Sequence, residues 1–406
     1  MIVKRLIRGL LRALAGAVLL VAGLIVTLLV VTGVEHRMPL ALPTPTGPFT
    51  VGRTSFDWVN PSITDELAPI PGTKREIVAW VWYPAAPVPT ATTAEYMPAT
   101  WRTADMRYSG ILMSRFLTRD LSQVHTHSIR DATLAPVDRS YPVVILRAGG
   151  GALTTDYTTL AEDLASHGYV VVGFDAPYRT AVVVLSGGRV ITRPPARNPE
   201  TLPAAEQARL IKRLLPMWCT DVAFVLDRLE TLNASDPSGR FTGRLDLQHI
   251  GVFGHSFGGA TAAEFCHEDS RCKAGVDLDG APFGPVIQSG LRQPFMFVLS
   301  DQNGSGPEVQ LVFAHIQSIY DRLPVNSRLR IKILGANHFS FSDQILLKSQ
   351  VALRLMRMMG VLRLDGRRGL AITADYVGTF FDAYLKGRSG AHLQALERKY
   401  PEVRIQ

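Results

Sequence analysis

Residues 254–258, Gly-His-Ser-Phe-Gly, place a serine between two glycines at a spacing that suits nucleophilic catalysis. The apolar run before them, residues 250–253, is typical of a buried strand, and a helix of small residues is expected from Phe257 onward. A strand-to-helix turn of this kind lifts the serine hydroxyl above the sheet edge, and its glycines avoid a collision between the two elements. The sequence therefore predicts Ser256 as a nucleophile; the alternative is a structural serine in a glycine-rich turn.

A nucleophilic serine needs a base, and histidine serves most often. Of the ten histidines, His338 follows the last predicted strand. In folds built around such a turn the base comes from that position, in the chain order serine, acid, histidine. We therefore predict His338 as the general base. His255 is expected to pack beside the nucleophile, and His315 is expected within a helix without a catalytic role.

The acid that orients the histidine has two candidates. Asp279 follows the strand after the nucleophile helix, and Asp301 follows the next strand. A carboxylate at either strand end is able to hold the imidazole in one tautomer and stabilise the imidazolium that forms. Asp277 is expected inside its strand, with a structural role. The residues alone leave Asp279 and Asp301 open.

The elements that would position these residues alternate along the chain. Short apolar runs closed by glycine, proline or aspartate predict strands, each taken with its closing residues, at 75–84, 141–151, 169–177, 249–256, 273–280 and 293–301, and a last strand with its loop at 327–339. Helices are predicted at residues 156–168, 218–232, 257–268, 307–323, 344–360 and 369–387, with Asp156 and Asp343 as N-caps of the first and fifth. This alternation indicates an α/β fold with a mainly parallel sheet and helices on both faces.

The N-terminus predicts membrane attachment. Residues 13–34 contain no charge and are long enough to cross a bilayer as a helix, and basic residues precede them. No small-residue cleavage site ends this run, so we expect an uncleaved anchor within residues 1–35, with a cytoplasmic N-terminus and an extracytoplasmic catalytic domain. Residues 36–50 are proline-rich and predict a stiff spacer. The domain is expected at residues 51–406, with a lid-like insertion at about 178–216.

Charge and cysteines exclude or leave open other classes. The net charge is +8, and the basic residues outside the N-terminal segment are spread thinly, which argues against a nucleic-acid partner. Cys266 and Cys272 are spaced to close a short loop in an oxidising compartment, with Cys219 left over; three free thiols are the alternative. His125 and His127 form a pair without a third metal ligand in view.

Four segments carry a resemblance to a known family: YPVVILRAGGGALTTDYTTLAEDLASHGYVVVGFD, GHSFGGATAAE, LDGAPFGP and NHFSFSD. Together they resemble the plasma-type platelet-activating factor acetylhydrolases, which are α/β-hydrolases related to dienelactone hydrolases and bacterial polyester-hydrolysing lipases. The resemblance covers roughly residues 51–387. It implies a serine carboxylic-ester hydrolase of the α/β-hydrolase fold, and its L-D-x-x-x-x-P pattern falls on Asp279, which favours that residue over Asp301.

The oxyanion hole is expected from two backbone N–H groups. Phe257, directly after the nucleophile, supplies the first. The resemblance places the second at Gly150, within the loop that follows the strand at 141–147. The family's S-H-G-L-G-A sequence is replaced here by Arg147-Ala148-Gly149-Gly150-Gly151, so the usual histidine is Ala148. Backbone donors survive this change, and the rigidity of the loop is expected to differ from that in the family.

The resulting reaction is ester hydrolysis through an acyl-enzyme, which requires no metal or organic cofactor. Three other functions use the same fold. An acyltransferase would pass the acyl group to an alcohol, a peptidase would cleave amides, and a non-catalytic binding protein would usually lack a member of the triad. Phospholipids with short or oxidised chains, small esters and polyesters are all compatible substrates.

Overall fold

The computed structural model describes residues 2–87, 91–194, 202–301, 306–360 and 362–406. The domain after α1 (Ile2–Arg37) is built around a single mixed sheet. The sheet order is β1-β5-β2-β3-β7-β6-β10-β11-β12-β13-β14, and β4 pairs with β5. From β7 to β13 all neighbouring strands are parallel, whereas β3 and β14 pair antiparallel with the two ends of this block. The predicted α/β fold with a mainly parallel sheet is confirmed.

The strands of the sheet are β1 (Leu40–Ala41), β2 (Thr50–Thr64), β3 (Lys74–Ala85), β4 (Thr93–Glu95), β5 (Val124–Arg130), β6 (Tyr141–Arg147), β7 (Val170–Asp175), β10 (Leu245–His255), β11 (Cys272–Leu278), β12 (Phe295–Leu299), β13 (Arg328–Ile333) and β14 (Val403–Ile405). A separate hairpin consists of β8 (Val182–Val184) and β9 (Val190–Thr192). The parallel strands β6, β7, β11 and β12 are buried along almost their whole length, as expected for a sheet covered on both faces.

The helices are α1 (Ile2–Arg37), α2 (Ala99–Ile111), α3 (Thr158–Ser166), α4 (Ala204–Ala234), α5 (Phe257–Glu268), α6 (Val286–Ser289), α7 (Pro307–Arg322), α8 (Gln344–Leu347), α9 (Gln350–Met358), α10 (Gly366–Leu385) and α11 (Ala391–Lys399). A π-helix (Leu112–Leu117) follows α2, and 3-10 turns include Thr154–Tyr157 and His338–Phe341. One apolar core packs α3 and α10 against the sheet, and a second packs α4, α5 and α7 against the opposite face.

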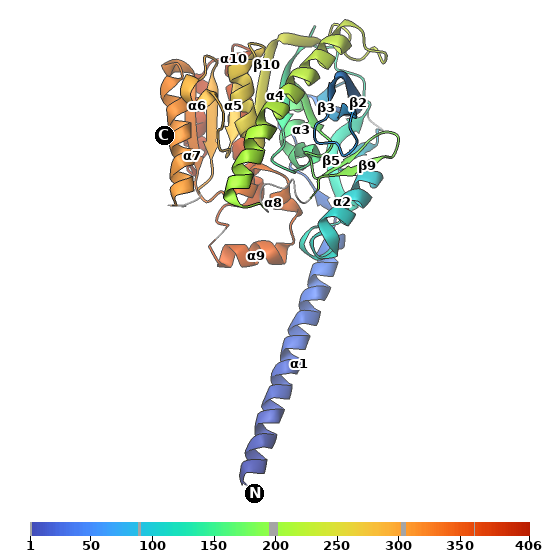
Figure 1. Ribbon diagram of the computed structural model, residues 1–406, viewed down its shortest axis with the longest axis vertical. Helices are drawn as coiled ribbons and strands as arrows, with labels where there is room; N and C mark the ends of the chain where they lie inside the picture. The colour runs from blue at the N-terminus through green and yellow to red at the C-terminus, as the bar shows by residue number, and fades with distance from the viewer. Residues whose placement is uncertain (1, 88–90, 195–201, 302–305, 361) are drawn as a thin grey trace.

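Helix α1 projects away from the domain as a single straight rod (Figure 1). Residues 5–37 form a helix that is long and apolar enough to cross a membrane, and its most apolar window makes no buried contact with the domain. The same length and composition also occur in signal sequences. The C-terminal turn of α1 is joined to the domain, because Glu35 accepts a hydrogen bond from Ser349 Oγ at 2.7 Å.

Residues 36–50, expected as a spacer, lie against the domain. The backbone N–H and the hydroxyl of Thr46 both donate to Asp163 at 2.8 Å, and the N–H of Gly47 donates to Ser166 Oγ at 2.9 Å. Strand β1 within this segment pairs with β5. The prolines remove backbone donors from this segment, and the N–H groups of Leu42 and Phe49 donate to the carbonyls of His125 and Ser166.

The segment expected as an insertion divides into two parts. Its first part is the β8–β9 hairpin, and residues 195–201 lie outside the described residues. Its second part is the beginning of α4, which starts at Ala204 rather than near Trp218 and continues through Pro216. A proline removes one helical hydrogen bond, and the flanking residues are good helix formers, so the helix continues across it.

The structure also resolves the cysteine question. Cys266 at the end of α5 and Cys272 at the start of β11 form a disulfide, and Cys219 is free and buried. The bridge closes the short loop between the nucleophile helix and the next strand. The helix predicted at residues 344–360 is divided into α8 and α9, with Lys348 and Ser349 between them.

Candidate active site

The turn between β10 and α5 has the geometry of a nucleophile elbow. Ser256 has a φ of 57°, a conformation that a non-glycine residue adopts only where its surroundings enforce it. Its N–H donates to the carbonyl of Leu278 at 2.9 Å, which ties the turn to β11. A Cβ on Gly254 would lie 2.2 Å from the carbonyl oxygen of Gly258, so strand and helix cross with no space for a side chain.

His338 and Asp279 form a hydrogen-bonded pair. Nδ1 of His338 lies 2.8 Å from Oδ2 of Asp279, so Nδ1 carries the proton and Nε2 is left as a base. Asp279 also accepts a hydrogen bond from the N–H of Ser300 at 2.8 Å. Burial acts to raise the pKa of Asp279, but the contact with His338 and the bond from Ser300 hold that pKa below its usual value.

The other two aspartates near these strand ends have different partners. Asp301 forms an ion pair with Lys332 at 3.1 Å and accepts a hydrogen bond from the N–H of Gly335 at 3.0 Å. Asp277 is fully buried and accepts from the N–H of Gly280 at 2.7 Å, and burial raises its pKa well above the usual value. Asp301 therefore supports the loop before His338, and Asp277 supports the turn that presents Asp279.

The two residues expected as oxyanion donors lie close together. A Cβ built on Gly150 would lie 3.7 Å from the Cβ of Phe257, so the two backbones approach closely beside Ser256. Phe257 is the first residue of α5, and the positive end of that helix dipole lies at the same place. The neighbouring N–H of Gly149 has another role, because it donates to the hydroxyl of Tyr157 at 3.1 Å.

His255, expected only to pack, connects two loops of the site. Its Nε2 lies 2.8 Å from the carbonyl oxygen of His338, which only accepts, so Nε2 must carry the proton. Its Nδ1 then accepts from the hydroxyl of Tyr157 at 2.8 Å, and that oxygen accepts from Gly149. Burial and the neighbouring His338 lower the pKa of His255 to about 3, so the ring is neutral. One directed chain of hydrogen bonds therefore joins the glycine loop to the loop that carries His338.

Ser256, Phe257, Asp279, His338 and Gly150 line one cavity of about 280 Å³. This volume is slightly below the usual range for ligand pockets, about 300–1,000 Å³. The remaining lining residues are Tyr178, Arg179, Arg193, Gln207, Ile211, Leu214, Trp218, Ala281 and Phe283. The aromatic residues Trp218 and Phe283 line the cavity, whereas Phe341 is buried in the core and Phe339 is exposed.

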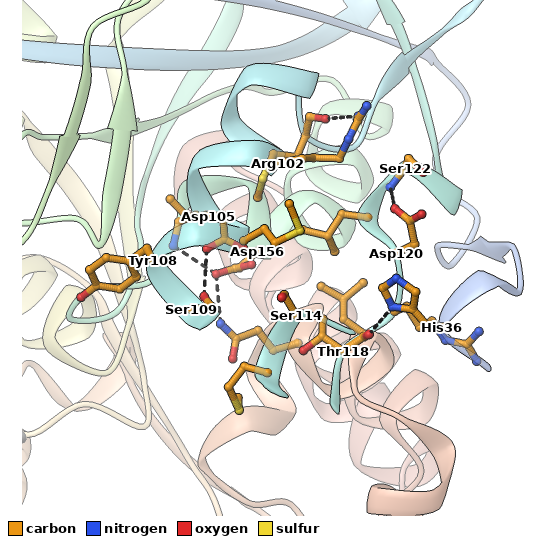
Figure 2. Close-up of a pocket in the computed structure, with 18 of the residues that line it drawn as sticks. His36, Arg102, Asp105, Tyr108, Ser109, Ser114, Thr118, Asp120, Ser122 and Asp156 are labelled. Carbon is orange, nitrogen blue, oxygen red and sulfur yellow. Dashed lines mark hydrogen bonds between the residues drawn. The ribbon is translucent and has the colours of Figure 1, made fainter. Parts of the chain in front are cut away.

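A second cavity, of about 770 Å³, lies between the end of α1, α2 and the far side of the glycine loop (Figure 2). Asp156 lines this cavity and is not the N-cap of the helix, contrary to the prediction from the sequence. Its carboxylate instead accepts a hydrogen bond from the N–H of Leu153 at 3.0 Å, in the turn before α3. Burial raises the pKa of Asp156 to about 7.

Asp343 occupies the N-cap position of α8, but its side chain accepts from the N–H of Thr159 at 3.2 Å instead of capping that helix.

Residues 35–186 and 228–388 match the family described as platelet-activating factor acetylhydrolase, isoform II. The chain belongs to this family. The resemblance expected from its motifs is thereby confirmed, and the chain is a carboxylic-ester hydrolase with the α/β-hydrolase fold. Residues 187–227, which include β9 and the first part of α4, fall between the two matched ranges.

Three similar proteins place this acetylhydrolase-family chain among esterases. A probable 1-alkyl-2-acetylglycerophosphocholine esterase of Arthroderma benhamiae is 25% identical over 95% of this chain and 99% of that protein. The platelet-activating factor acetylhydrolase of Cavia porcellus is 26% identical over 59% of this chain, and the chain spans 58% of that relative. The solved ferulic acid esterase of Streptomyces cinnamoneus superposes with a TM-score of 0.71 at 28% identity, over 90% of this chain and 99% of that structure.

Three contributors to the site were not predicted from the sequence. Tyr157 and Arg193 lie outside any catalytic motif, and the N–H of Ser300 has no side-chain signal at all. The prediction for His255 recognised its position but not its function. Of these three, only Tyr157 has a signal in the sequence, because it follows the glycine loop within an amphipathic segment. That signal indicates burial and does not indicate a role in the site.

Proposed function

We propose that this esterase cleaves its substrate with Ser256, His338 and Asp279 as a catalytic triad. Ser256 Oγ attacks the ester carbonyl while Nε2 of His338 takes its proton, and His338 then gives that proton to the leaving alcohol. Water then attacks the acyl-enzyme while Nε2 of His338 takes its proton, and His338 returns that proton to Ser256 Oγ as the acid is released. Asp279 fixes the tautomer of His338 throughout.

The observation that carries this proposal is the 2.8 Å contact between Asp279 and Nδ1 of His338, at the wall of the cavity that contains Ser256. The contact leaves Nε2 of His338 free to act as a base. The N–H groups of Phe257 and Gly150 are the proposed oxyanion donors, because their backbones meet beside Ser256. Removal of one such donor typically costs about 100-fold or more in kcat.

The proposed substrates are esters with a short acyl group. The small cavity supports this limit, and so does the similar probable 1-alkyl-2-acetylglycerophosphocholine esterase, whose name refers to an acetyl ester. We further propose that α1 remains attached as a membrane anchor with a cytoplasmic N-terminus, because Lys4, Arg5, Arg8 and Arg12 precede its apolar part. The domain would then act on esters on the extracytoplasmic side of that membrane.

The test compares the full-length protein in detergent with its Ser256→Ala variant on p-nitrophenyl esters from acetate to palmitate. We expect turnover to fall to the uncatalysed rate in the variant, and we expect labelling by a fluorophosphonate to disappear with it. Rates in the wild type should decline as the acyl chain outgrows the cavity. A Ser256→Ala variant that still turns over and still labels would contradict the proposed nucleophile.

A further inference from the structure

The catalytic cavity contains a cation that the proposed mechanism does not use. Arg193 follows β9 and lines the cavity together with Ser256. The residue is only 8% exposed, and its Nε is buried with no hydrogen-bond partner among the described residues. A buried charge is costly unless an opposite charge or hydrogen-bond acceptors compensate it. Arg193 is therefore placed where an arriving anion would be favourable.

Arg179, the other arginine of the cavity, is already neutralised. Its Nη1 donates to both carboxylate oxygens of Asp65, at 3.1 and 3.0 Å, and its Nε lies 3.1 Å from Oδ2 of Asp221. Arg75 pairs with the same two aspartates, so two cations face two anions. Within the described part of the chain, Arg193 has no such carboxylate. The one described carboxylate that lines the cavity is Asp279, which is bound to His338.

The position of Arg193 places its charge close to the reacting bond. A Cβ on Gly151 would lie 2.5 Å from Nη2 of Arg193, so the guanidinium packs directly on the backbone of Gly151. Gly151 adjoins Gly150, the proposed oxyanion donor. The guanidinium therefore lies against the residue next to the proposed oxyanion donor, at the wall of the cavity that Ser256 also lines. The planar fork of arginine suits a carboxylate or phosphate, which it binds through two parallel hydrogen bonds.

We propose that Arg193 selects esters that carry an anionic group, a carboxylate or a phosphate, near the scissile bond. This inference rests on the proposed function, because it assigns the substrate class of the same site. Arg193 also lies within residues 187–227, between the two ranges that match the family. The anion has two possible sources, the acyl part and the alcohol part of the ester.

The test uses full-length protein in detergent and two matched substrate pairs, with hydrolysis followed by proton release. Monoethyl succinate against ethyl butanoate places the charge on the acyl side. Dibutanoyl phosphatidic acid against dibutanoylglycerol places it on the alcohol side. We expect the wild type to prefer the charged member of one pair, and we expect Arg193→Gln to lower kcat/KM for that member by about tenfold or more. The neutral esters should change less than about twofold.

Two variants serve as controls. Arg193→Lys keeps the charge without the fork and should keep part of the preference. Arg189→Gln removes an exposed cation of the same hairpin, which pairs with Glu76, and should leave both ratios unchanged. Hydrolysis of the neutral esters reports correct folding. Ser256→Ala must abolish all four reactions; if it does not, the proposed function itself fails.

Two results would overturn the inference while leaving the triad intact. The first is a wild type that shows no preference for the charged member of either pair, a result that needs no variant. The second is an Arg193→Gln variant that loses the same factor on neutral and charged esters, because this indicates support of the glycine loop rather than recognition of an anion. The pair that responds identifies whether the charge belongs to the acid or the alcohol.

Discussion

At the scale of single residues, we expect the carboxylate that contacts His338 to control the rate. Asp279→Asn keeps the shape of the contact but favours the wrong tautomer of His338, and we expect kcat to fall by about 10³- to 10⁴-fold. Asp301→Asn removes only the ion pair with Lys332 and the strongest part of the bond from Gly335, so its kcat should fall less than about tenfold. Steady-state kinetics on p-nitrophenyl butyrate measures both. Equal losses in the two variants would contradict the assignment of Asp279.

The hydrogen-bond chain through His255 leads to a second prediction. Tyr157→Phe leaves the N–H of Gly149 and Nδ1 of His255 buried without partners, so we expect about 1–3 kcal/mol less stability. Because the chain connects the glycine loop to the loop of His338, kcat should also fall about tenfold with little change in KM.

Tyr96 provides the matched control for that variant. It is also fully buried, but its hydroxyl has no hydrogen-bond partner among the described residues. Tyr96→Phe should therefore leave both the unfolding free energy and kcat nearly unchanged. Chemical unfolding and steady-state kinetics on the two variants make the comparison. If Tyr96→Phe and Tyr157→Phe lose the same stability and rate, the chain through His255 has no special function.

Residues with a local signature could be predicted from the sequence, and residues defined by long-range contacts could not. Ser256 stands between two glycines at a strand-to-helix junction, and His338 follows a strand, so position along the chain was informative. The two aspartates each follow a strand, and only the fold shows that Asp279 meets His338 while Asp301 meets Lys332. The identity of such partners depends on side-chain directions that periodicity does not contain.

At the scale of elements, the crossing of β10 and α5 is the most constrained part of the site. We expect Gly254→Ala to destabilise the protein by about 3 kcal/mol and to abolish activity, because the added methyl would overlap the carbonyl of Gly258. Gly187→Ala is the control, since no atom lies within 4 Å of its Cβ position, and its effect should stay within about 0.5 kcal/mol. Thermal unfolding with activity assays measures both; an active, stable Gly254→Ala variant would contradict the elbow geometry.

The turn before α3 gives a pH-dependent prediction. Asp156 lies beside Asp105 in the cavity of Figure 2, and burial, with a contribution from Asp105, raises its pKa from 3.8 to about 7. The folded protein thus holds this proton more tightly than the unfolded chain, so the contribution of Asp156 to stability is lost as pH rises from about 4 through about 7.

Asp156→Asn removes this titration. Relative to the wild type, the variant should gain about 2–3 kcal/mol of unfolding free energy between pH 5 and pH 8, at about 1.4 kcal/mol per pH unit between the two pKa values. Urea unfolding of both proteins at several pH values measures the difference, and Asp163→Asn, near the other end of α3, is a comparison variant. A difference between Asp156→Asn and the wild type that does not vary with pH would show that Asp156 is ionised in the folded protein.

Elements were predictable where their hydrophobic pattern was strong. The buried parallel strands read as continuous apolar runs, and the structure contains a strand at each predicted place. The segment between β3 and β6 had weak periodicity, and it folds into α2, a π-helix and two short strands that depend on packing against other elements. The first half of α4 was missed because Pro216 suggested a boundary, although one proline removes only one helical hydrogen bond.

At the scale of the whole molecule, we expect the attachment of α1 to govern where the enzyme acts but not how it acts. Among the described residues, none of the cavity that contains Ser256 belongs to α1. The end of α1 is nevertheless held by the domain, since Nδ1 of His36 lies 2.9 Å from the carbonyl of Thr118 and Glu35 accepts from Ser349. The helix and the domain therefore share contacts that stabilise their junction, close to the start of α9.

Removal of α1 should separate these two roles. We expect the full-length protein to remain in the membrane fraction after a carbonate wash with its N-terminal residues intact, and we expect a chain of residues 40–406 to be recovered in the soluble fraction.

On p-nitrophenyl butyrate the shortened chain should keep kcat/KM within about threefold, because the triad and glycine loop are unchanged. Its melting temperature should fall, because Ser349 and Thr118 lose their partners. Glu35→Gln in the full-length protein isolates that stability effect from anchoring. If expression of the full-length sequence instead yields a soluble product whose mass lacks residues 1–35, α1 is a cleaved signal and the anchor is contradicted.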